Sequence, residues 1–362
     1  MTLPGGRIYS DPAILEREKE RIFFRSWQYA AHASQLAEPG DYVTMWVLDQ
    51  GVVVIRGKDR RLRAFYNVCQ HRAHELLRGS GRAKVITCPY HAWSYHADGR
   101  LRSARGSEKA QGFDASAICL QPVRVEQLLD LVFVNLDRDA TPLAETFPGL
   151  AEEITERTPW LGDVRWVGPD RGDRPGPPEP ELAANWKVLA ENCLECYHCV
   201  PSHPAFVDLV DIGSYRVAVH DTWVSSLSRA GRPGNKAYPF RPNDPSRHAD
   251  FWYLWPNTTL NVLPGDPRFI AFRFEPAGPV ATRITVDVLA VPGTQPNAAR
   301  DAYGRDVLWP EDKSICEAVQ RGLTSAGYRQ GRFIVDRDMT EISEHGVHHF
   351  QVLWSRAMGV SP

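Results

Sequence analysis

Two cysteine–histidine pairs in the first third of the chain constrain its fold and chemistry more than any other feature. Cys69-x-His71 and Cys88-x-x-His91 are separated by sixteen residues, 72–87. Two short loops that each supply one Cys and one His provide two thiolates and two imidazoles. That set matches a two-iron, two-sulfur cluster in which both thiolates bind one iron and both imidazoles bind the other. The pattern therefore predicts an iron–sulfur cluster held between two loops.

Zinc is the main alternative for these four residues. Structural zinc modules usually pair Cys with Cys and His with His at narrow spacings, and Cys-x-His followed by Cys-x-x-His departs from that pattern. Imidazole in place of two thiolates raises the reduction potential of a cluster, as in Rieske centres. We therefore expect Cys69, His71, Cys88 and His91 to hold a Rieske-type [2Fe–2S] cluster.

Length and composition are those of an ordinary globular protein. The 362 residues are 43% hydrophobic, 10% aromatic and 24% charged, and suffice for two domains with separate cores. A net charge of −2 argues against nucleic acid as a partner. No apolar stretch reaches the roughly 18 residues of a spanning helix, and the N-terminal residues lack a signal-peptide core. We expect no membrane partner, a cytoplasmic location and, for the seven cysteines, reduced thiols and metal ligands rather than disulfides.

The opening residues predict a helix, and the next hundred predict strands. Asp11 supplies an N-cap before Pro12, and we expect residues 1–38 to form an N-terminal helical segment that packs on the catalytic domain. Runs such as YVTMWVL and GVVVIRG are rich in branched and aromatic residues, and DLVFVNLD is the expected last strand. Residues 39–140 are therefore predicted to form a small antiparallel β domain around the two cluster loops.

A second sheet is predicted within the remaining domain, 141–362. FWYLWPNTTLNVLPG, RFIAFRFEP and TRITVDVLAVPG are expected to be consecutive antiparallel strands. A proline- and glycine-rich run at 168–180 predicts a surface connector. The proline-broken segment 230–248 fits either a lid over a pocket or an irregular insert, and the sequence does not choose. The fold class expected for the whole chain is α+β.

Two helices are predicted after this sheet. An amphipathic helix from about Asp312 to Ala326 should bury Ile315, Val319 and Leu323. The last helix should begin near Ile342.

A second group of metal-ligand residues lies in NWKVLAENCLECYHCVPSHP, residues 185–204. On an ideal helix His198 and His203 would point about 140° apart. Pro201 loosens the helix between them, because it lacks an N–H and its ring clashes with the preceding turn, so His203 can turn toward His198. Two histidines and one carboxylate form the facial ligand set of non-heme Fe(II) oxygenases. We expect both histidines to bind a mononuclear iron.

Three cysteines, Cys193, Cys196 and Cys199, recur at every third residue of the same predicted helix. Each would be rotated by about 300° from the last, and no fourth cysteine is nearby, so a second iron–sulfur cluster is disfavoured. We expect them to be buried and to act as small apolar residues.

The carboxylate ligand of the mononuclear iron is left open by spacing alone. The candidates are acids near the start of the predicted helix after the second sheet: Asp301, Asp306, Glu311, Asp312 and Glu317. A resemblance distinguishes them. CxHR and CPYHAW resemble the Rieske domain of ring-hydroxylating and demethylating oxygenases, and WPEDKSICEAVQRGLTSAGYRQGRF with ISEHGVHHFQ is similar to the oxygenase components that attack carnitine, glycine betaine and related quaternary amines. In that branch the acid at the position of Asp312 binds iron with the two histidines.

The resemblance, which reaches from the first helix to Gln351, implies more about the assembly. It implies a Rieske domain followed by a helix-grip domain that holds mononuclear iron. It also implies a homotrimer, in which the cluster of one subunit lies beside the iron of its neighbour. Glu195 is the residue expected to lie between the two metals. It precedes His198 by three residues and should share its helix face, and ECYHC has Glu where the wider family usually has Asp in this role.

The reaction that the resemblance implies is reductive activation of O₂: one oxygen atom enters a C–H bond and the other leaves as water. No GxGxxG or flavin signature occurs in the chain. A separate flavin and ferredoxin-type reductase should therefore supply electrons from NAD(P)H.

Aromatic residues are the expected contacts for a small quaternary-amine substrate, because their faces attract a methylammonium cation. Strand alternation places Tyr253 and Trp255 on one face and Trp252 on the other, and these three are the candidate substrate-binding residues. We expect oxidation of an N-methyl group to a hemiaminal that releases formaldehyde. Cys193 stands where the similar carnitine enzymes have an aromatic residue, which favours a different betaine or N-methyl amine.

Two other functions share part of this pattern. An aromatic-ring dioxygenase would have the same metal motifs with an apolar pocket. A Rieske electron-transfer protein would use only the cluster, and His198, His203 and Asp312 would then be incidental.

Overall fold

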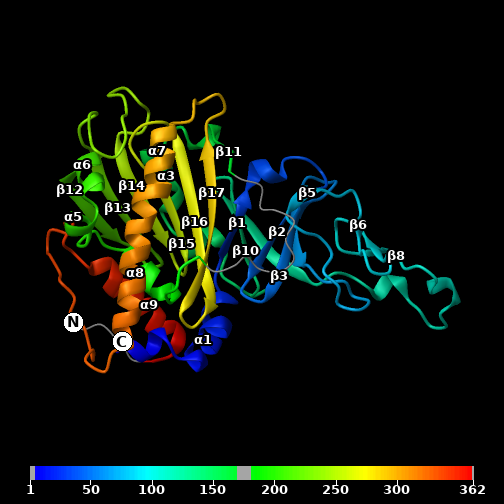
Figure 1. The fold of residues 1–362 in the computed structure, drawn as a ribbon. Helices are drawn as coiled ribbons and strands as arrows, with labels where there is room; N and C mark the ends of the chain where they lie inside the picture. The colour runs from blue at the N-terminus through cyan, green and yellow to red at the C-terminus, as the bar shows by residue number, and fades with distance from the viewer. Residues whose placement is uncertain (1–4, 169–180, 361–362) are drawn as a thin grey trace. The chain divides into compact units, whose positions relative to one another are not determined.

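The computed structural model describes residues 5–168 and 181–360 (Figure 1). They form two compact units, which we call the β unit, Phe23–Glu145, and the helix–sheet unit, which contains residues 5–22, 146–168 and 181–360. The expected connector lies, apart from Gly168, outside the described residues. No helix of the described residues is long and apolar enough to cross a membrane.

The β unit is antiparallel, with one large and one small sheet. The order of the large sheet is β1 (Gln28–His32), β10 (Leu131–Asn135), β9 (Pro122–Leu128), β4 (Leu62–Tyr66), β3 (Gln50–Arg56), β2 (Asp41–Val47) and β5 (Ser80–Arg82). The small sheet contains β6 (Ile86–Thr87), β7 (Ser94–Tyr95) and β8 (Leu101–Ser103). Short helical turns are η3 (Ala33–Leu36), η4 (Ser107–Lys109) and η5 (Ala115–Ala117), and α2 (Leu143–Thr146) follows the last strand.

The strands expected in this unit are present. The side chains of β10 are buried at all five positions, which explains why its sequence is a continuous apolar run. The expected boundary at residue 38 differs from the division in the structure, because β1 pairs with β10 inside the β unit while residues 5–22 belong to the helix–sheet unit.

The helix–sheet unit contains a seven-stranded antiparallel sheet. Its order is β11 (Arg165–Trp166), β17 (Ala281–Ala290), β16 (Arg268–Gly278), β15 (Thr258–Val262), β14 (His248–Leu254), β13 (Trp223–Ala230) and β12 (Val210–Val219). The predicted strands correspond to β14–β17. Strands β12 and β13, which extend the sheet at one edge, were not predicted from the sequence. The α+β fold class is confirmed.

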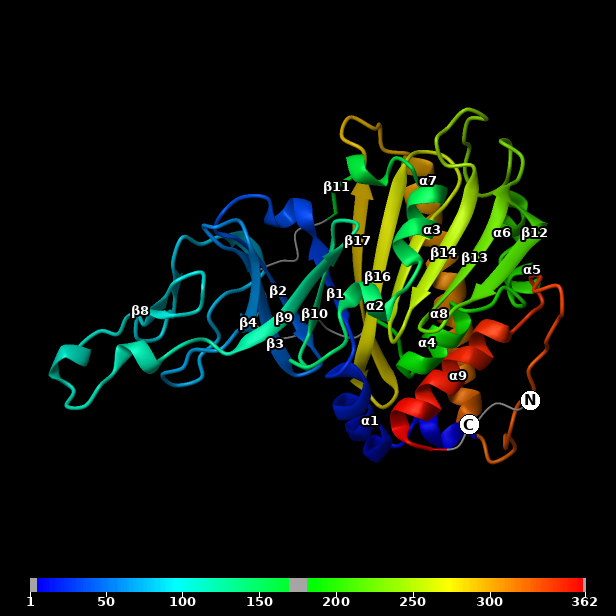
Figure 2. The same cartoon turned by 180° about the vertical axis from the view of Figure 1, so that it is seen from behind.

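Helices cover both faces of this sheet: α8 lies across one face and α3 lies on the other (Figures 1 and 2). The helices of the unit are α1 (Pro12–Glu18), α3 (Leu150–Arg157), α4 (Trp186–Asn192), α5 (Cys199–Ser202), α6 (Pro204–Leu209), α7 (Ala298–Tyr303), α8 (Trp309–Leu323) and α9 (His345–Met358). Shorter or wider turns are η1 (Gly6–Tyr9), η2 (Lys19–Phe23), η6 (Leu161–Asp163) and η7 (Gly304–Leu308).

The buried face of α8 differs from the predicted one. Cys316 and Gln320 are buried, whereas Val319 is 44% exposed. The helix begins at Trp309, three residues earlier than expected, and the row that faces the interior is Asp312, Cys316 and Gln320, spaced by four. The Gln320 amide explains why a polar residue is tolerated there, because its oxygen accepts from the Asn185 N–H at 2.8 Å.

Residues 231–247 connect β13 to β14 and are anchored rather than loose. Tyr238 is buried, and its hydroxyl donates to the carbonyl of Pro264 at 2.9 Å. Of the two alternatives left open by the sequence, these contacts favour an irregular insert that is fixed to the residues just after β15.

Asp11 caps α1 by accepting from the Ala13 N–H at 2.8 Å, as predicted.

A buried carboxylate, that of Glu18, joins three helices of this unit. Glu18, at the end of α1, accepts from Lys187 Nζ at 2.6 Å and from the Trp354 indole at 2.7 Å. All three side chains are buried, so the charge of each ion is paired and hydrogen-bonded where water cannot solvate it. This network fixes α4, the helix that precedes His198 and His203 in the segment 185–204.

Candidate functional site

Two loops of the β unit, which contain Cys69 and Cys88, share one backbone conformation. In each, the cysteine N–H donates to the carbonyl five residues later, at 2.9 Å for Cys69 and 2.8 Å for Cys88. Each cysteine carbonyl accepts from the N–H four residues later, on Ala73 and Ala92, at 3.0 Å in both loops. Ala73 and Ala92 both have left-handed backbones, with φ of 55° and 59°. Two loops with different sequences are therefore folded to present their ligands in the same way.

The four predicted cluster ligands divide into an inner and an outer pair. The thiols of Cys69 and Cys88 are buried in the core of the unit, whereas His71 is exposed and His91 half-buried. The two imidazole centroids lie 4.6 Å apart, and the Tyr95 hydroxyl lies 3.2 Å from the Cys69 sulfur. Burial is the main reason that the pKa of Cys88 is raised and that of His91 is lowered.

This arrangement fits a two-iron cluster with one thiolate-bound iron inside and one imidazole-bound iron outside. Ligands of a single zinc ion would all gather around one point. Among the described residues, the only group of three or more ligand atoms found within 4.8 Å of one another lies elsewhere, at His198, His203 and Asp312. The donor geometry of the loops therefore favours a cluster over zinc.

The histidine segment is not one helix, contrary to the prediction. Helix α4 ends at Asn192, a turn follows, and α5 begins after His198. His203 lies between α5 and α6 with φ −123° and ψ 64°, because the following Pro204 disfavours a helical conformation at the residue before it. The imidazole centroids of His198 and His203 lie 5.0 Å apart. The two rings thus converge as expected, but through a break at Pro204 rather than through a helix loosened at Pro201.

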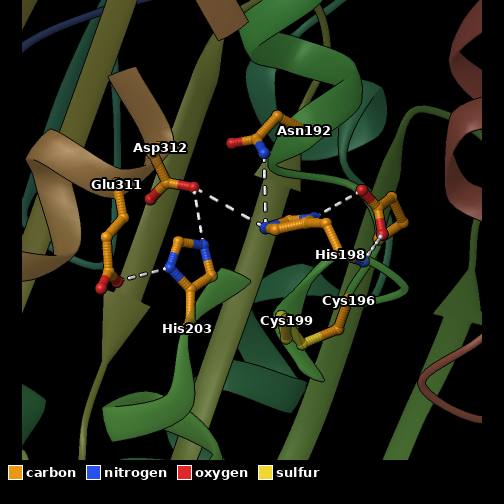
Figure 3. Close-up of a disulfide and its surroundings, with 8 residues drawn as sticks. Asn192, Cys196, His198, Cys199, His203, Glu311 and Asp312 are labelled. Carbon is orange, nitrogen blue, oxygen red and sulfur yellow. Dashed lines mark hydrogen bonds and ion pairs between the residues drawn. A yellow bond between two sulfur atoms is a disulfide. The ribbon is translucent and has the colours of Figure 1, made fainter. Parts of the chain in front are cut away.

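Asp312 completes the group from α8. Its Oδ1 lies 3.1 Å from His203 Nε2 and 3.7 Å from His198 Nε2 (Figure 3). The ligand atoms of all three residues lie within 4.8 Å of one another. Two imidazoles and one carboxylate facing a common point are the donors that a non-heme Fe(II) site uses. The residues present therefore fit the metal that the sequence pattern predicted.

The electrostatics of this group are dominated by the acids around it. Burial acts to lower the pKa of His198, but its hydrogen bonds to Asp312 and Glu195 outweigh burial and raise the pKa to about 9. Burial acts to raise the pKa of Asp312, yet the hydrogen bonds of the two histidines hold it below its usual value. The group is therefore built to hold positive charge.

Two glutamates contact the outer nitrogens of the same imidazoles. Glu195 Oε1 lies 2.5 Å from His198 Nδ1, and Glu311 Oε2 lies 2.8 Å from His203 Nδ1. Glu195 was expected on the helix face of His198. Instead it lies in the turn after α4, and its other oxygen accepts from the His198 N–H at 3.1 Å. Glu311 was predicted only as one of the candidate metal ligands, and its contact with the outer nitrogen of His203 was not predicted.

The cysteines of this segment do not act as three separate apolar residues. Cys196 and Cys199 are buried but joined by a disulfide, which encloses His198 in its loop (Figure 3). Cys193 is free and lines the cavity beside the histidines. It is exposed, so the prediction that it is buried is wrong. The prediction of reduced cysteines throughout is wrong for this pair. On a continuous helix the Cβ atoms of residues three apart lie about 5–6 Å from each other, whereas a disulfide needs about 3.5–4.5 Å, and the chain after the end of α4 at Asn192 allows that closer approach.

A cavity of about 200 Å³ opens in front of His198, His203 and Asp312. Residues spaced by two on neighbouring strands line it, because alternate side chains of a strand point to the same face. Phe251 and Tyr253 on β14 pair with Asn261 and Thr259 on β15, which sets these side chains in two adjacent rows. Further aromatic residues in the lining are Phe206, Tyr215, Phe272, Phe274 and Trp309.

The three predicted substrate contacts are placed differently from one another. Tyr253 lines the cavity, as alternation predicted. Trp252 borders it, but its indole N–H donates to Glu153 on α3 at 3.0 Å, on the opposite face of the sheet. Trp255 is absent from the described cavity lining and packs against Phe350, with ring centroids 5.5 Å apart. It lies past the end of β14, so the alternation used to place it no longer applies.

Family comparisons agree with the geometry of the two cysteine–histidine loops and with that of the group formed by His198, His203 and Asp312. The Rieske [2Fe-2S] domain model matches residues 26–116, and the model of the ring hydroxylating alpha subunit catalytic domain matches residues 169–359. The carnitine monooxygenase oxygenase subunit of Acinetobacter baumannii is 41% identical over 355 residues, which cover 96% of this chain and 92% of that protein. The chloroplastic choline monooxygenase of Amaranthus tricolor is 28% identical, over 96% and 76%.

Solved structures give the same result for the fold. A quaternary ammonium Rieske monooxygenase superposes with a TM-score of 0.90 at 36% identity, over 99% of this chain and 95% of the other. A naphthalene 1,2-dioxygenase from Rhodococcus shares the fold, with a TM-score of 0.80 at 21% identity over 100% and 95%. A Rieske cluster and a mononuclear iron are the cofactors of such proteins. This chain belongs to the ring-hydroxylating alpha-subunit family, and it is an oxidoreductase of the Rieske oxygenase type.

Proposed function

We propose that this chain is the terminal oxygenase of a multicomponent system that oxidises an N-methyl group of a small quaternary ammonium compound. The observation that carries the proposal is the position of His198, His203 and Asp312 at one end of a small, aromatic-lined cavity. Relatives whose names include carnitine and choline monooxygenase support it, because both compounds carry a trimethylammonium group.

The lining of the cavity suits such a cation. A methylammonium group cannot accept a hydrogen bond, and aromatic faces attract it by about 0.5 to 2 kcal/mol each. Phe251 and Tyr253 on β14 and Phe272 and Phe274 on β16 supply four such rings, on either side of β15. The side chain of Asn261 offers hydrogen bonds to a polar tail. The rings should therefore direct the N-methyl end of the substrate, rather than its tail, toward the histidines.

We propose the following roles for the metal ligands. Cys69 and Cys88 would bind the inner iron of the cluster, and His71 and His91 the outer one; His198, His203 and Asp312 would bind the mononuclear iron. When bound, the cluster supplies electrons and the mononuclear iron supplies reductive activation of dioxygen.

Side chains around the ligands orient them and exclude water. Glu195 holds the outer nitrogen of His198 and would lie between this iron and the neighbouring cluster. The apolar walls of the cavity exclude water from the reacting methyl group, which prevents electrons from being lost to side reactions.

The reaction balances with two electrons from outside the chain. A substrate R₃N⁺–CH₃ with O₂, two electrons and two protons gives R₃N⁺–CH₂OH and water. The hydroxymethyl compound then breaks its C–N bond to give R₃N, formaldehyde and a proton. We propose a flavin and ferredoxin-type reductase in the cytoplasm as the source of these electrons, with NAD(P)H as the donor.

We further propose a homotrimer. The solved relative is described in terms of inter-subunit electron transfer. In this chain each unit exposes aromatic or apolar side chains next to its metal ligands: Tyr90 is 51% exposed in the cluster loop, and Tyr197 and Val200 are 48% and 55% exposed around His198. Exposed apolar side chains of this kind favour contact with another protein surface.

A substrate panel tests the proposed function. The purified chain, loaded with iron and supplied with a surrogate reductase, is given betaines, N-methyl amines and aromatic acids, and the products are identified by mass spectrometry. We expect a demethylated amine and formaldehyde in equal amounts from at least one quaternary amine. A cis-dihydrodiol or phenol from an aromatic substrate, with no turnover of any amine, would instead assign the chain to aromatic-ring oxidation.

A further inference from the structure

Two adjacent acids on α8 contact opposite nitrogens of one imidazole. Asp312 Oδ1 lies 3.1 Å from His203 Nε2, and Glu311 Oε2 lies 2.8 Å from His203 Nδ1 (Figure 3). Consecutive residues on a helix point about 100° apart, so α8 can grip both edges of a ring that lies between them. His203 itself is buried, and only 3% of its side chain is exposed.

The single proton of a neutral imidazole determines which nitrogen can bind a metal. A histidine that binds through Nε2 must carry its proton on Nδ1, and the acceptor at Nδ1 fixes this tautomer. Glu311 is that acceptor for His203. If Glu311 were absent, the proton could move to Nε2 and be donated to Asp312, its hydrogen-bond partner at that nitrogen. In that tautomer His203 Nε2 would carry the proton and Asp312 Oδ1 would accept it in a hydrogen bond. Two of the three ligand atoms would then be unable to bind a metal.

The geometry points to Glu311 as a positioning residue that holds His203 in the metal-binding tautomer and orientation. We propose that it does for His203 what Glu195 does for His198, so that each imidazole is held by its own glutamate. This inference rests on the proposed function, because it assumes a metal at His198, His203 and Asp312.

The surroundings of Glu311 allow its side chain to be replaced without disturbing the core. Its side chain is 29% exposed and borders an open groove on the outer side of α8, together with Ser202 and Asp306. Truncating it therefore leaves no closed void in the core, and a large loss of stability is not expected. Asp306 provides a control for charge, since it precedes α8 by a turn and forms an exposed ion pair with Arg305 at 2.7 Å.

The experiment compares five proteins: the unmodified chain, Glu311→Ala, Glu311→Gln, Asp306→Ala and Asp312→Ala. Each is stripped of mononuclear iron and titrated anaerobically with Fe(II), and the electron paramagnetic resonance spectrum of its nitric oxide adduct is recorded. We expect Glu311→Ala to bind Fe(II) about 10- to 100-fold more weakly and to give an altered nitrosyl spectrum. Glu311→Gln should recover part of the affinity, because its amide oxygen still accepts from Nδ1, and Asp306→Ala should match the unmodified chain.

Two outcomes separate the inference from the function on which it rests. If Glu311→Ala keeps the affinity and spectrum of the unmodified chain, the positioning role is wrong while the iron site stands. If the unmodified chain binds no Fe(II) with a defined nitrosyl spectrum, and Asp312→Ala behaves in the same way, the proposed iron site itself is wrong. A loss of the same size in Asp306→Ala would reduce the effect to one of net charge and would also overturn the inference.

Discussion

At the scale of single residues, neighbouring side chains in this site have different roles. Asp312 faces the inner nitrogens of both histidines, whereas Glu311 and Glu195 each face one outer nitrogen. The inner acid is placed where it could bind a metal, and the outer acids can act only through the imidazole rings that they contact.

Asp312→Ala should therefore lose the mononuclear iron and all oxygenase activity. The cluster ligands lie in the other unit, so the visible spectrum of the cluster should be unchanged. Iron and acid-labile sulfide per chain, measured with the spectrum, check this expectation. A variant that keeps its third iron would show that Asp312 is not the carboxylate ligand.

Glu195→Gln should keep both metal centres but slow the transfer of electrons between them. The amide oxygen of the variant still accepts a hydrogen bond from His198. The negative charge that Glu195 places 2.5 Å from His198 Nδ1 is removed. We expect oxidation of the reduced cluster by oxygen and substrate to slow about 10- to 100-fold. Stopped-flow absorbance of the cluster gives the rate. An unchanged rate would remove Glu195 from the pathway between the metals.

The ligands were predictable from sequence to different degrees, and the reason is physical. Cys69, His71, Cys88 and His91 occupy two short loops, so their spacing alone carries most of the geometry. The choice between Glu311 and Asp312 depends on how α8 is rotated against the histidines, and both acids prove to contact His203. Spacing could not separate them, and only the resemblance to quaternary-amine oxygenases favoured Asp312.

At the scale of elements, the site is shaped by the register of the strands and by the points at which the helices end, more than by which helices and strands are present. The strands β14 to β17 follow patterns visible in the sequence, but the cavity depends on their register. Phe272 and Phe274 line the cavity because of the register in which β16 pairs with β15 and β17. A local sequence pattern does not specify that register. The end of α4 at Asn192 was likewise hidden, since the residues after it are compatible with a helix.

One element-scale prediction concerns the contacts between α4, η1 and α9. Glu191 accepts from the Tyr9 hydroxyl at 2.7 Å and from Gln351. Desolvation raises its pKa from 4.5 to about 7, even though Tyr9, Lys187 and Gln351 act to lower it. Because the folded pKa is the higher one, the folded chain keeps a proton between about pH 5 and pH 7 that the unfolded chain has lost. The stability from this proton is complete at lower pH and disappears as the pH rises through 7.

Glu191→Gln should remove this dependence on pH. The free energy of unfolding of the unmodified chain should fall by an amount on the order of 2 kcal/mol more than that of the variant between about pH 5 and pH 7.5. Urea unfolding of the iron-loaded proteins across this range checks the difference. Parallel pH profiles would mean that Glu191 titrates at its ordinary pKa in the folded protein.

At the scale of the whole molecule, the order of the domains and their cofactors followed from the motifs, whereas the assembly did not. The two metal sites lie in separate units of one chain. If electrons pass between subunits of a trimer, two inactive variants should complement each other. Cys88→Ser should lack the cluster and keep the iron, and Asp312→Ala should do the reverse.

Hybrid trimers made by co-expressing these variants should recover activity. In a random mixture about a quarter of the neighbouring cluster and iron pairs are intact, so about a quarter of the normal turnover is expected. Mixtures of the separately purified variants, in which each trimer is assembled from one variant alone, serve as the control. Hybrids no more active than that mixture would contradict electron transfer between subunits.

The central claim is that this chain uses electrons from its cluster to oxidise an N-methyl group in the cavity. It is tested most directly by a single turnover without reductase. The protein is chemically reduced, freed of reductant, and mixed with a quaternary amine that it binds and with oxygen. We predict formaldehyde and the demethylated amine in equal amounts from the reduced protein and neither product from protein with an oxidised cluster. Reoxidation of the cluster without any formaldehyde, for every quaternary amine that binds, would contradict the account.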